Sequence, residues 1–224
     1  MSGYYSTTLA GERLRRCYEI APPRVRRYLD EEARFVCRRL AQTDAVLELG
    51  CGYGRVVWQL ARAARLVVGI DASRESLRLA GTLTDPTLPC RFAATDAARL
   101  AFRPRSFDVV VCAQNGVCAF HADPAVLLAE ALRVVRSPGR VLFSTYSERF
   151  WPDRLDWFRL QAAEGLVGAI DETATRPGTI VCRDGFSVGT MSADSLRAVC
   201  AGLGATPVLT EVDGSSLFCE IVVT

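Results

Sequence analysis

The chain has 224 residues and a formal net charge of +2. This length suits one α/β domain with a full core, and so small a charge does not indicate a partner as strongly charged as nucleic acid. All 27 basic residues are arginine. Those near the start lie among acidic residues, which is typical of a solvated helix face. A phosphate-binding patch is the alternative interpretation of this cluster.

Apolar strands alternate with amphipathic helices over the first two thirds of the chain. A short segment precedes Pro22 and Pro23, and a helix over 24–41 follows them. The predicted strands cover 45–50, 66–71, 90–96, 107–113 and 139–146, and the further predicted helices cover 56–64, 75–80 and 124–135. Continuously apolar strands that alternate with helices predict a parallel sheet covered on both faces.

The last third breaks this alternation. Its predicted elements are a helix over 154–168, a hairpin over 179–190 that turns at Asp184-Gly185, a helix over 192–202 capped by Ser192, and strands over 206–212 and 216–223. The short turn between the last two strands requires them to pair antiparallel. The sequence therefore predicts an α/β fold with a single doubly wound seven-stranded sheet, mostly parallel, with an antiparallel C-terminal edge strand.

We expect one domain over 1–224. It divides into an N-terminal helical cap (1–40), a cofactor-binding core (41–146), an insertion after the fifth strand (147–191), and a closing helix and strands (192–224). The insertion combines a helix with a hairpin and is long enough to form a lid that excludes water. A dimer surface is the alternative use of the same segment.

A glycine-rich turn follows the first predicted strand in the stretch ELGCGYGR (48–55). Its GxGxG spacing differs from the GxGxxG of pyrophosphate-binding turns. Glu48, Asp71 and Asp96 end three consecutive predicted strands, so their carboxylates are expected to line one crevice at the carboxyl edge of the sheet. The negative charge of Glu48 disfavours a diphosphate beside the turn and favours a cationic ligand. The structural alternative is that an acid at the end of a single strand only caps a turn.

The stretches LELGCGYGR, VVGID and AATDA resemble successive motifs of the class I S-adenosylmethionine-dependent methyltransferases, over about residues 40–146. This resemblance implies S-adenosylmethionine as the cofactor. It implies that Glu48, Gly50 and Gly52 surround the methionine part, that Asp71 holds the ribose, and that Asp96 and Ala97 lie beside the adenine. Cys51, Ala72 and Gln114 complete the expected cofactor-binding set.

The acceptor side is less defined. The loop CAQNGVCAFH (112–121) loosely resembles the asparagine-containing loop of glycine-type N-methyltransferases, and it contains the only histidine of the chain. The candidate catalytic residues are His121, Asn115 and Tyr146; further candidate pocket walls are Tyr4, Tyr5, Tyr18, Phe150 and Trp151. Asn115-Gly116 can equally be a plain turn, and Asp123 is expected to cap the next helix. Methyl transfer needs a base only where the acceptor must lose a proton.

The predicted function is methyl transfer from S-adenosylmethionine to a small-molecule acceptor through an N, O or S atom. The alternatives are an RNA methyltransferase docked by its arginine-rich first helices, and a cofactor-binding regulatory or scaffold protein without transfer activity. A nicotinamide dehydrogenase is disfavoured by the turn spacing and by Glu48. We expect a cytoplasmic monomer or homodimer without membrane partner or metal, and with nine free cysteines acting mainly as core filler rather than as soft-metal ligands.

Overall fold

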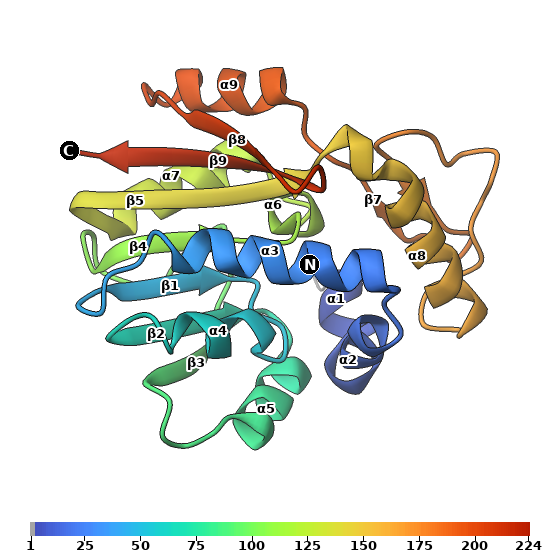
Figure 1. Ribbon diagram of the computed structural model, residues 1–224, viewed down its shortest axis with the longest axis horizontal. Coiled ribbons are helices and arrows are strands. Elements are labelled where there is room, and N and C mark those ends of the chain that lie inside the picture. Colours follow the sequence, from blue (N-terminus) through green and yellow to red (C-terminus); the bar gives the residue numbers. More distant parts are fainter. Residues whose placement is uncertain (1–2) are drawn as a thin grey trace.

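Seven strands form one mixed sheet in the centre of the molecule (Figure 1), a computed structural model that describes residues 3–224. The strand order is β3-β2-β1-β4-β5-β9-β8. The strands are β1 Ala45–Leu49, β2 Leu66–Asp71, β3 Cys90–Ala94, β4 Phe107–Cys112, β5 Val135–Tyr146, β8 Val208–Val212 and β9 Ser216–Val223. Strands β1 to β5 pair parallel, whereas β9 pairs antiparallel with both β5 and β8. The predicted fold class is confirmed, with β9 as the reversed strand and β8 at the edge.

The helices cover both faces of this sheet. They are α1 Tyr4–Thr7, α2 Gly11–Glu19, α3 Pro23–Cys37, α4 Arg55–Leu60, α5 Arg74–Leu83, α6 Gly116–Ala119, α7 Pro124–Val134, α8 Trp151–Ala163 and α9 Ala193–Gly202, with a 3₁₀ turn η1 Glu148–Phe150. The predicted caps are present: Asp123 accepts from the amide of Ala125 and Ser192 from that of Ser195. Helix α8 ends earlier than expected, because Gly165 turns the chain at φ 67°.

The core has two layers because strand residues alternate between the two faces. Leu47 and Leu49 of β1 belong to the cluster packed against α7 and α9, whereas Val46 belongs to the cluster packed against α3 and α4. The central strands β1 and β4 are buried on both faces, which explains their largely apolar sequences. The polar residues that end these strands are thereby brought to one edge.

The segments outside this alternation gather beyond that edge. Helices α1, α2 and α8 lie together at one end of the sheet, with the hairpin of β6 (Ile180–Val181) and β7 (Ser187–Val188) beside α8 (Figure 1). The hairpin turns at Gly185, which has φ 94°, as the sequence predicts. None of the helices within 3–224 combines the length and the apolar character needed to cross a membrane.

Candidate active site

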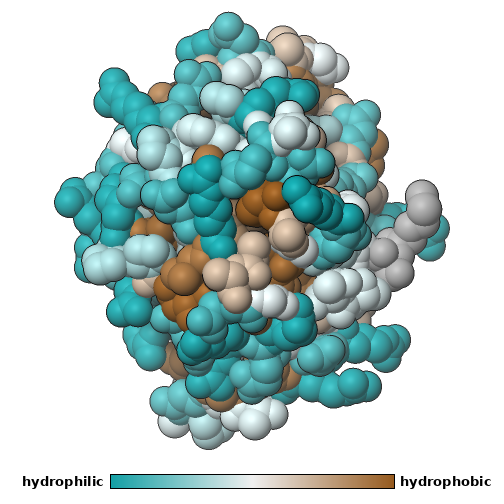
Figure 2. Space-filling model, turned by 90° about the vertical axis from the view of Figure 1, so that its right-hand side faces the viewer, coloured by the Kyte–Doolittle hydropathy of each residue, from teal (hydrophilic) through white to brown (hydrophobic). Residues whose placement is uncertain are grey.

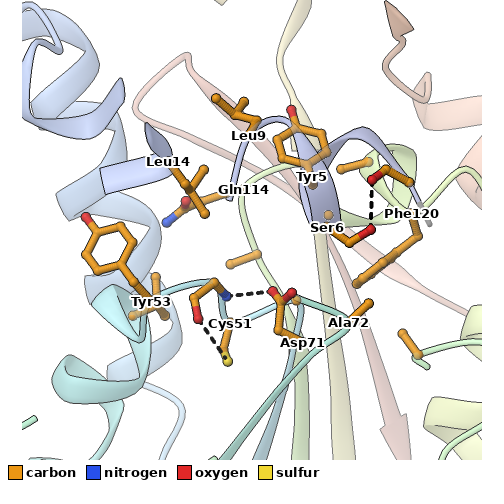
Figure 3. A pocket seen from close by; sticks show the side chains of 18 of the residues that line it. Tyr5, Ser6, Leu9, Leu14, Cys51, Tyr53, Asp71, Ala72, Gln114 and Phe120 are labelled. Atoms are coloured by element: carbon orange, nitrogen blue, oxygen red, sulfur yellow. Dashed lines mark hydrogen bonds between the residues drawn. The ribbon is translucent and has the colours of Figure 1, made fainter. Parts of the chain in front are cut away.

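A cavity of about 790 Å³ lies at the carboxyl ends of β1, β2, β3 and β4. This volume is in the upper part of the range of small-molecule sites, roughly 300–1,000 Å³. Its floor comes from the strand ends and the glycine-rich turn, and its cover comes from α1, α2 and α8. Figure 3 shows Tyr5, Leu9 and Leu14 of the cover facing Cys51 and Asp71 of the floor across the cavity. In open α/β sheets this edge is where ligands bind.

The glycine-rich turn brings bare backbone to the cavity. Gly50 and Gly52 have φ values of 72° and 54°, in the left-handed region that favours glycine. A Cβ atom at Gly50 would lie 2.9 Å from Cζ of Phe120, and one at Gly52 would lie 2.9 Å from Cδ2 of Leu14. Both positions therefore favour glycine for their conformation, and a Cβ atom at either would force the facing side chain to shift.

Asp71 ties the turn to the second strand. Its Oδ2 accepts from the amide of Gly52 (2.8 Å), and its Oδ1 accepts from the amide of Ser73 (2.7 Å). Each carboxylate oxygen keeps a second lone pair for a ligand hydroxyl. Burial raises the pKa of Asp71, and the two amide hydrogen bonds oppose this rise.

Glu48 is a buried carboxyl group without a full set of partners. It lines the cavity at 3% exposure, and its Oε2 has no hydrogen-bond partner among the described residues. Burial raises the pKa of Glu48 to about 8, against the attraction of Arg55. Asp96, by contrast, is exposed, and its Oδ1 accepts from the amide of Ala98 (2.8 Å).

Two further cavity residues carry unused donors. Arg55 follows the glycine-rich turn, and its Nε and one terminal nitrogen are buried without a partner within 3–224. Gln114, just after β4, likewise has an unpaired Nε2, whereas its backbone amide donates to Oε2 of the buried Glu32 (2.9 Å). Buried polar groups normally have partners. Glu48, Arg55 and Gln114 therefore present one acceptor and several donors to the cavity.

Most of the sequence-predicted residues converge on this cavity. All nine of the expected cofactor residues line it, namely Glu48, Gly50, Cys51, Gly52, Asp71, Ala72, Asp96, Ala97 and Gln114. Tyr146 and His121 also line it. His121 is exposed at the end of α6, with φ 50°.

Asn115 does not reach the cavity. Its side chain is buried; Nδ2 donates to the carbonyl of Gly189 (2.9 Å), and Oδ1 accepts from the hydroxyl of Thr145 (2.8 Å). Asparagine also tolerates the left-handed conformation found here, φ 59°. Asn115 thus joins β5 to the segment after the hairpin, which is a different position from that expected of a catalytic group.

The aromatic residues that were expected to wall the pocket also divide into those that line the cavity and those that do not. Tyr5 and Tyr18 line the cavity, whereas three others do not. Tyr4 donates to Oδ2 of Asp184 (2.6 Å) in the hairpin, and Phe150 is fully buried, packed against Tyr28 with ring centroids 4.9 Å apart.

The third, Trp151, packs in the apolar cluster beneath the hairpin instead of facing the cavity. It begins α8, and the cavity-facing residues of this helix come later in its sequence.

Sequence reasoning missed several wall residues of the cover. They are Ser6, Leu9, Leu14, Cys17, Trp157, Phe158 and Gln161. One sequence pattern could have predicted that this face of α8 borders a site: Gln161 lies at helical spacing from apolar Trp157 and Phe158. A buried glutamine on an apolar helix face requires a hydrogen-bond partner. Figure 2 shows apolar side chains gathered around a hollow in the middle of this hydrophilic end of the molecule.

The cover is fastened by hydrogen bonds between distant segments. Arg13 of α2 donates to the carbonyls of Gly165 (2.7 Å) and Leu166 (2.9 Å), beyond α8. The indole nitrogen of Trp157 donates to the carbonyl of Cys17 (2.9 Å). These bonds tie α2 to the 147–191 segment over the cavity, whereas a lid motion of that segment stays a prediction.

The cysteines and acids offer no metal site in the described part of the chain. No group of three or more His, Cys, Asp or Glu side chains lies close enough to hold an ion there. All nine cysteines are free thiols, most of them buried. Their burial matches that of small core residues.

A family described as "Methyltransferase domain" matches residues 46–139. The chain is 36% identical over 105 residues to the 2-methyl-6-phytyl-1,4-hydroquinone methyltransferase of Synechocystis sp.. This alignment covers 46% of this chain and 32% of that protein. It is 36% identical over 102 residues to the ubiquinone biosynthesis O-methyltransferase of Ralstonia nicotianae, which covers 45% of this chain and 42% of that protein. The chain thus spans less than half the length of either relative.

Among solved structures, the PH0226 protein of Pyrococcus horikoshii OT3 superposes with a TM-score of 0.68. The alignment covers 99% of this chain and 98% of that protein at 19% identity. At such low identity the likeness concerns the fold. The likeness of fold therefore extends beyond residues 46–139 to nearly all of the described residues.

Proposed function

We propose, on the premise that this chain belongs to the class I S-adenosylmethionine-dependent methyltransferases, that it transfers the methyl group of S-adenosylmethionine to a small-molecule acceptor. The observation that carries this proposal is the set of unpaired buried polar atoms on Glu48, Arg55 and Gln114, beside the carboxylate of Asp71. These groups carry both charges, so they suit a zwitterionic ligand better than a diphosphate.

The residues present fit the parts of this cofactor one by one. The unpaired Oε2 of Glu48 suits the ammonium group of the methionine part, and the free donors of Arg55 and Gln114 suit its carboxylate. Asp71 offers carboxylate lone pairs for the ribose hydroxyls. Asp96, exposed to the cavity mouth, offers an acceptor for the adenine amino group.

The chemistry needs little from the protein beyond placement. When bound, the cofactor supplies a methyl group activated by a sulfonium; an acceptor lone pair bonds to the methyl carbon as the electrons of the carbon–sulfur bond return to sulfur, and any acceptor proton leaves. The residues of the cover would hold the acceptor in line with that bond, and positioning of this kind is a large part of catalysis. His121, at the cavity edge, is the candidate to take the proton.

The covered cavity favours a small acceptor over RNA. Tyr5, Leu14 and Trp157, from three different helices, wall the cavity on the side away from the sheet. A polymer would need an open approach and a strongly basic surface, whereas the net charge is +2. One relative with 36% identity is named as a methyltransferase of a hydroquinone, a small molecule, and the other as an O-methyltransferase of ubiquinone biosynthesis.

Two measurements test this proposal. Titration calorimetry is expected to give saturable binding of S-adenosylmethionine and none of NAD; the reverse result would overturn the cofactor assignment. Transfer of a labelled methyl group is then followed in separate fractions of small molecules and of RNA. Label in the RNA alone would favour the RNA alternative, and binding without any transfer would favour the regulatory or scaffold alternative.

A further inference from the structure

Two polar residues lie on the inward face of α8, where a packed helix normally carries apolar residues. The buried residues of α8 are Arg154, Trp157, Phe158 and Gln161, whose spacing is that of one helical face. Polar residues that break this apolar pattern indicate functional positions unless hydrogen bonds within the protein explain their presence. Arg154 has partners, since it donates to the carbonyl of Val188 at 3.1 Å.

Gln161 differs because its side chain lines the cavity. It is 2% exposed, so its amide is shielded from bulk solvent and borders the cavity. A buried amide among apolar neighbours is costly unless a hydrogen bond compensates it. The amide of Gln161 therefore points to a ligand with an oxygen or nitrogen atom at this end of the cavity.

The walls beside Gln161 are flat and fixed. The rings of Trp157 and Tyr18 have centroids 5.9 Å apart. Trp157 is held by its bond to the carbonyl of Cys17 (2.9 Å), and Tyr18 by its bond to Gln114 (2.9 Å). Aromatic rings held in this way provide a preorganised surface for another planar ring at low entropic cost.

The charges around these walls disfavour a cationic ligand. The acids that line the cavity, Glu48, Asp71 and Asp96, lie at or just after the ends of β1, β2 and β3, and no carboxylate belongs to the described lining residues of α1, α2 or α8. Behind the wall, the buried guanidinium of Arg154 lies 4.5 Å from the ring centroid of Tyr146 and pairs with no described acid. A positive charge without a counter-charge favours neutral or anionic neighbours.

We propose that Gln161 determines acceptor specificity, and that the acceptor is a planar aromatic ring, neutral or anionic, with a hydroxyl or carbonyl oxygen bound by the Gln161 amide. This inference rests on the proposed function, because it assigns the acceptor end of the same cavity.

The test uses defined probes on protein saturated with S-adenosylhomocysteine. Titrations with 1,4-hydroquinone and with benzylamine, a cationic ring of similar size, are followed by tryptophan fluorescence, to which Trp157 contributes together with Trp58 and Trp151. The expected result is saturable binding of hydroquinone with a lower Kd than that of benzylamine. Tighter binding of benzylamine, or no binding of hydroquinone, would overturn the inference.

Variants then address the residue itself. Gln161→Leu is expected to raise the Kd for hydroquinone by about threefold to tenfold, the value of one lost hydrogen bond, with little change in the Kd for S-adenosylhomocysteine. Gln42→Leu, the same change at an exposed residue outside the cavity, is expected to change neither. An unchanged Kd for hydroquinone in Gln161→Leu contradicts the role of this residue. Failure of S-adenosylhomocysteine to bind the unaltered protein would instead contradict the proposed function.

Discussion

The side chains of Tyr18 and Gln114 are joined by a hydrogen bond of 2.9 Å, in which the tyrosine hydroxyl donates to Oε1 of the amide. Tyr18 belongs to α2 of the cover, and Gln114 follows β4. The Nε2 of the same amide is left free in the cavity. One amide group therefore connects the cover to the region where we place the methionine part of the cofactor.

The variant Tyr18→Phe tests this connection, because it removes the hydroxyl and keeps the ring. We expect the affinity for S-adenosylmethionine to fall by about threefold to tenfold, since Gln114 loses the bond that orients it. Calorimetry provides the measurement. Tyr4→Phe is the matched control, as its hydroxyl bonds to Asp184 away from the cavity; equal losses in the two variants would contradict the role given to Gln114.

Asp71→Asn keeps the size of the side chain and removes its charge. Asp71 accepts from two backbone amides and is assigned to the ribose. We expect the affinity for S-adenosylmethionine to fall by about tenfold to a hundredfold, as for hydrogen bonds to a charged group, while the far-ultraviolet circular dichroism spectrum stays unchanged. Undiminished affinity would remove Asp71 from the cofactor site.

Glu48 predicts a pH dependence of stability without ligand. Burial raises its pKa to about 8 in the folded protein, whereas an unfolded chain has a value of about 4.3. Between these values the folded state binds the extra proton, so this contribution to the free energy of unfolding is present at low pH and is lost as pH rises through about 8.

Glu48→Gln cannot ionise, and we expect its melting temperature to decline less than that of the unaltered protein between pH 5 and pH 9. Scanning calorimetry across this range provides the comparison, in which all other titrating groups are shared. Parallel curves for the two proteins would mean that Glu48 is already ionised in the folded state.

Asn115→Ala is expected to affect stability more than cofactor binding. The change removes the hydrogen bond that Asn115 donates to the carbonyl of Gly189 and the one that it accepts from the hydroxyl of Thr145, at a cost of about 1–3 kcal/mol in the free energy of unfolding. Urea denaturation measures this cost, and calorimetry measures the affinity. A variant of unchanged stability that loses all turnover would restore Asn115 as a catalytic candidate.

His121→Ala is expected to lower turnover far more than cofactor affinity, because His121 lines the cavity at its exposed edge and imidazole is the commonest general base in enzymes. The comparison is between labelled methyl transfer at saturating acceptor and calorimetric affinity. Equal turnover would identify His121 as a loop residue and would mean that the acceptor needs no base.

The sequence predicted the sheet and its ligand edge because both follow from local patterns. Strands buried on both faces are continuously apolar, as Val109 to Val111 in β4 show, and the acids that end them are conspicuous. The residues of the glycine-rich turn were placed for the same reason, since the positive φ of Gly50 and Gly52 restricts what the chain can do there.

The cover could not be predicted in the same way, because its contacts join segments far apart in the sequence. Nothing near Trp157 indicates that its indole bonds to Cys17. Asn115 was chosen for its place after β4, yet its amide turns toward Gly189, a partner 74 residues away. Polar residues in loops have several possible partners, and only the tertiary structure selects one.

The distance along the chain between the bonded parts of the cover has a consequence for the order of folding. Arg13 bonds to Gly165 and Leu166, 152 and 153 residues later, and Tyr4 bonds to Asp184, 180 residues later. Contacts that close such long loops carry the largest entropic cost and tend to form late. We therefore expect backbone amides of α1 and α2 to gain protection in refolding after those of β1, β2 and β4, so that the floor of the cavity exists before its roof.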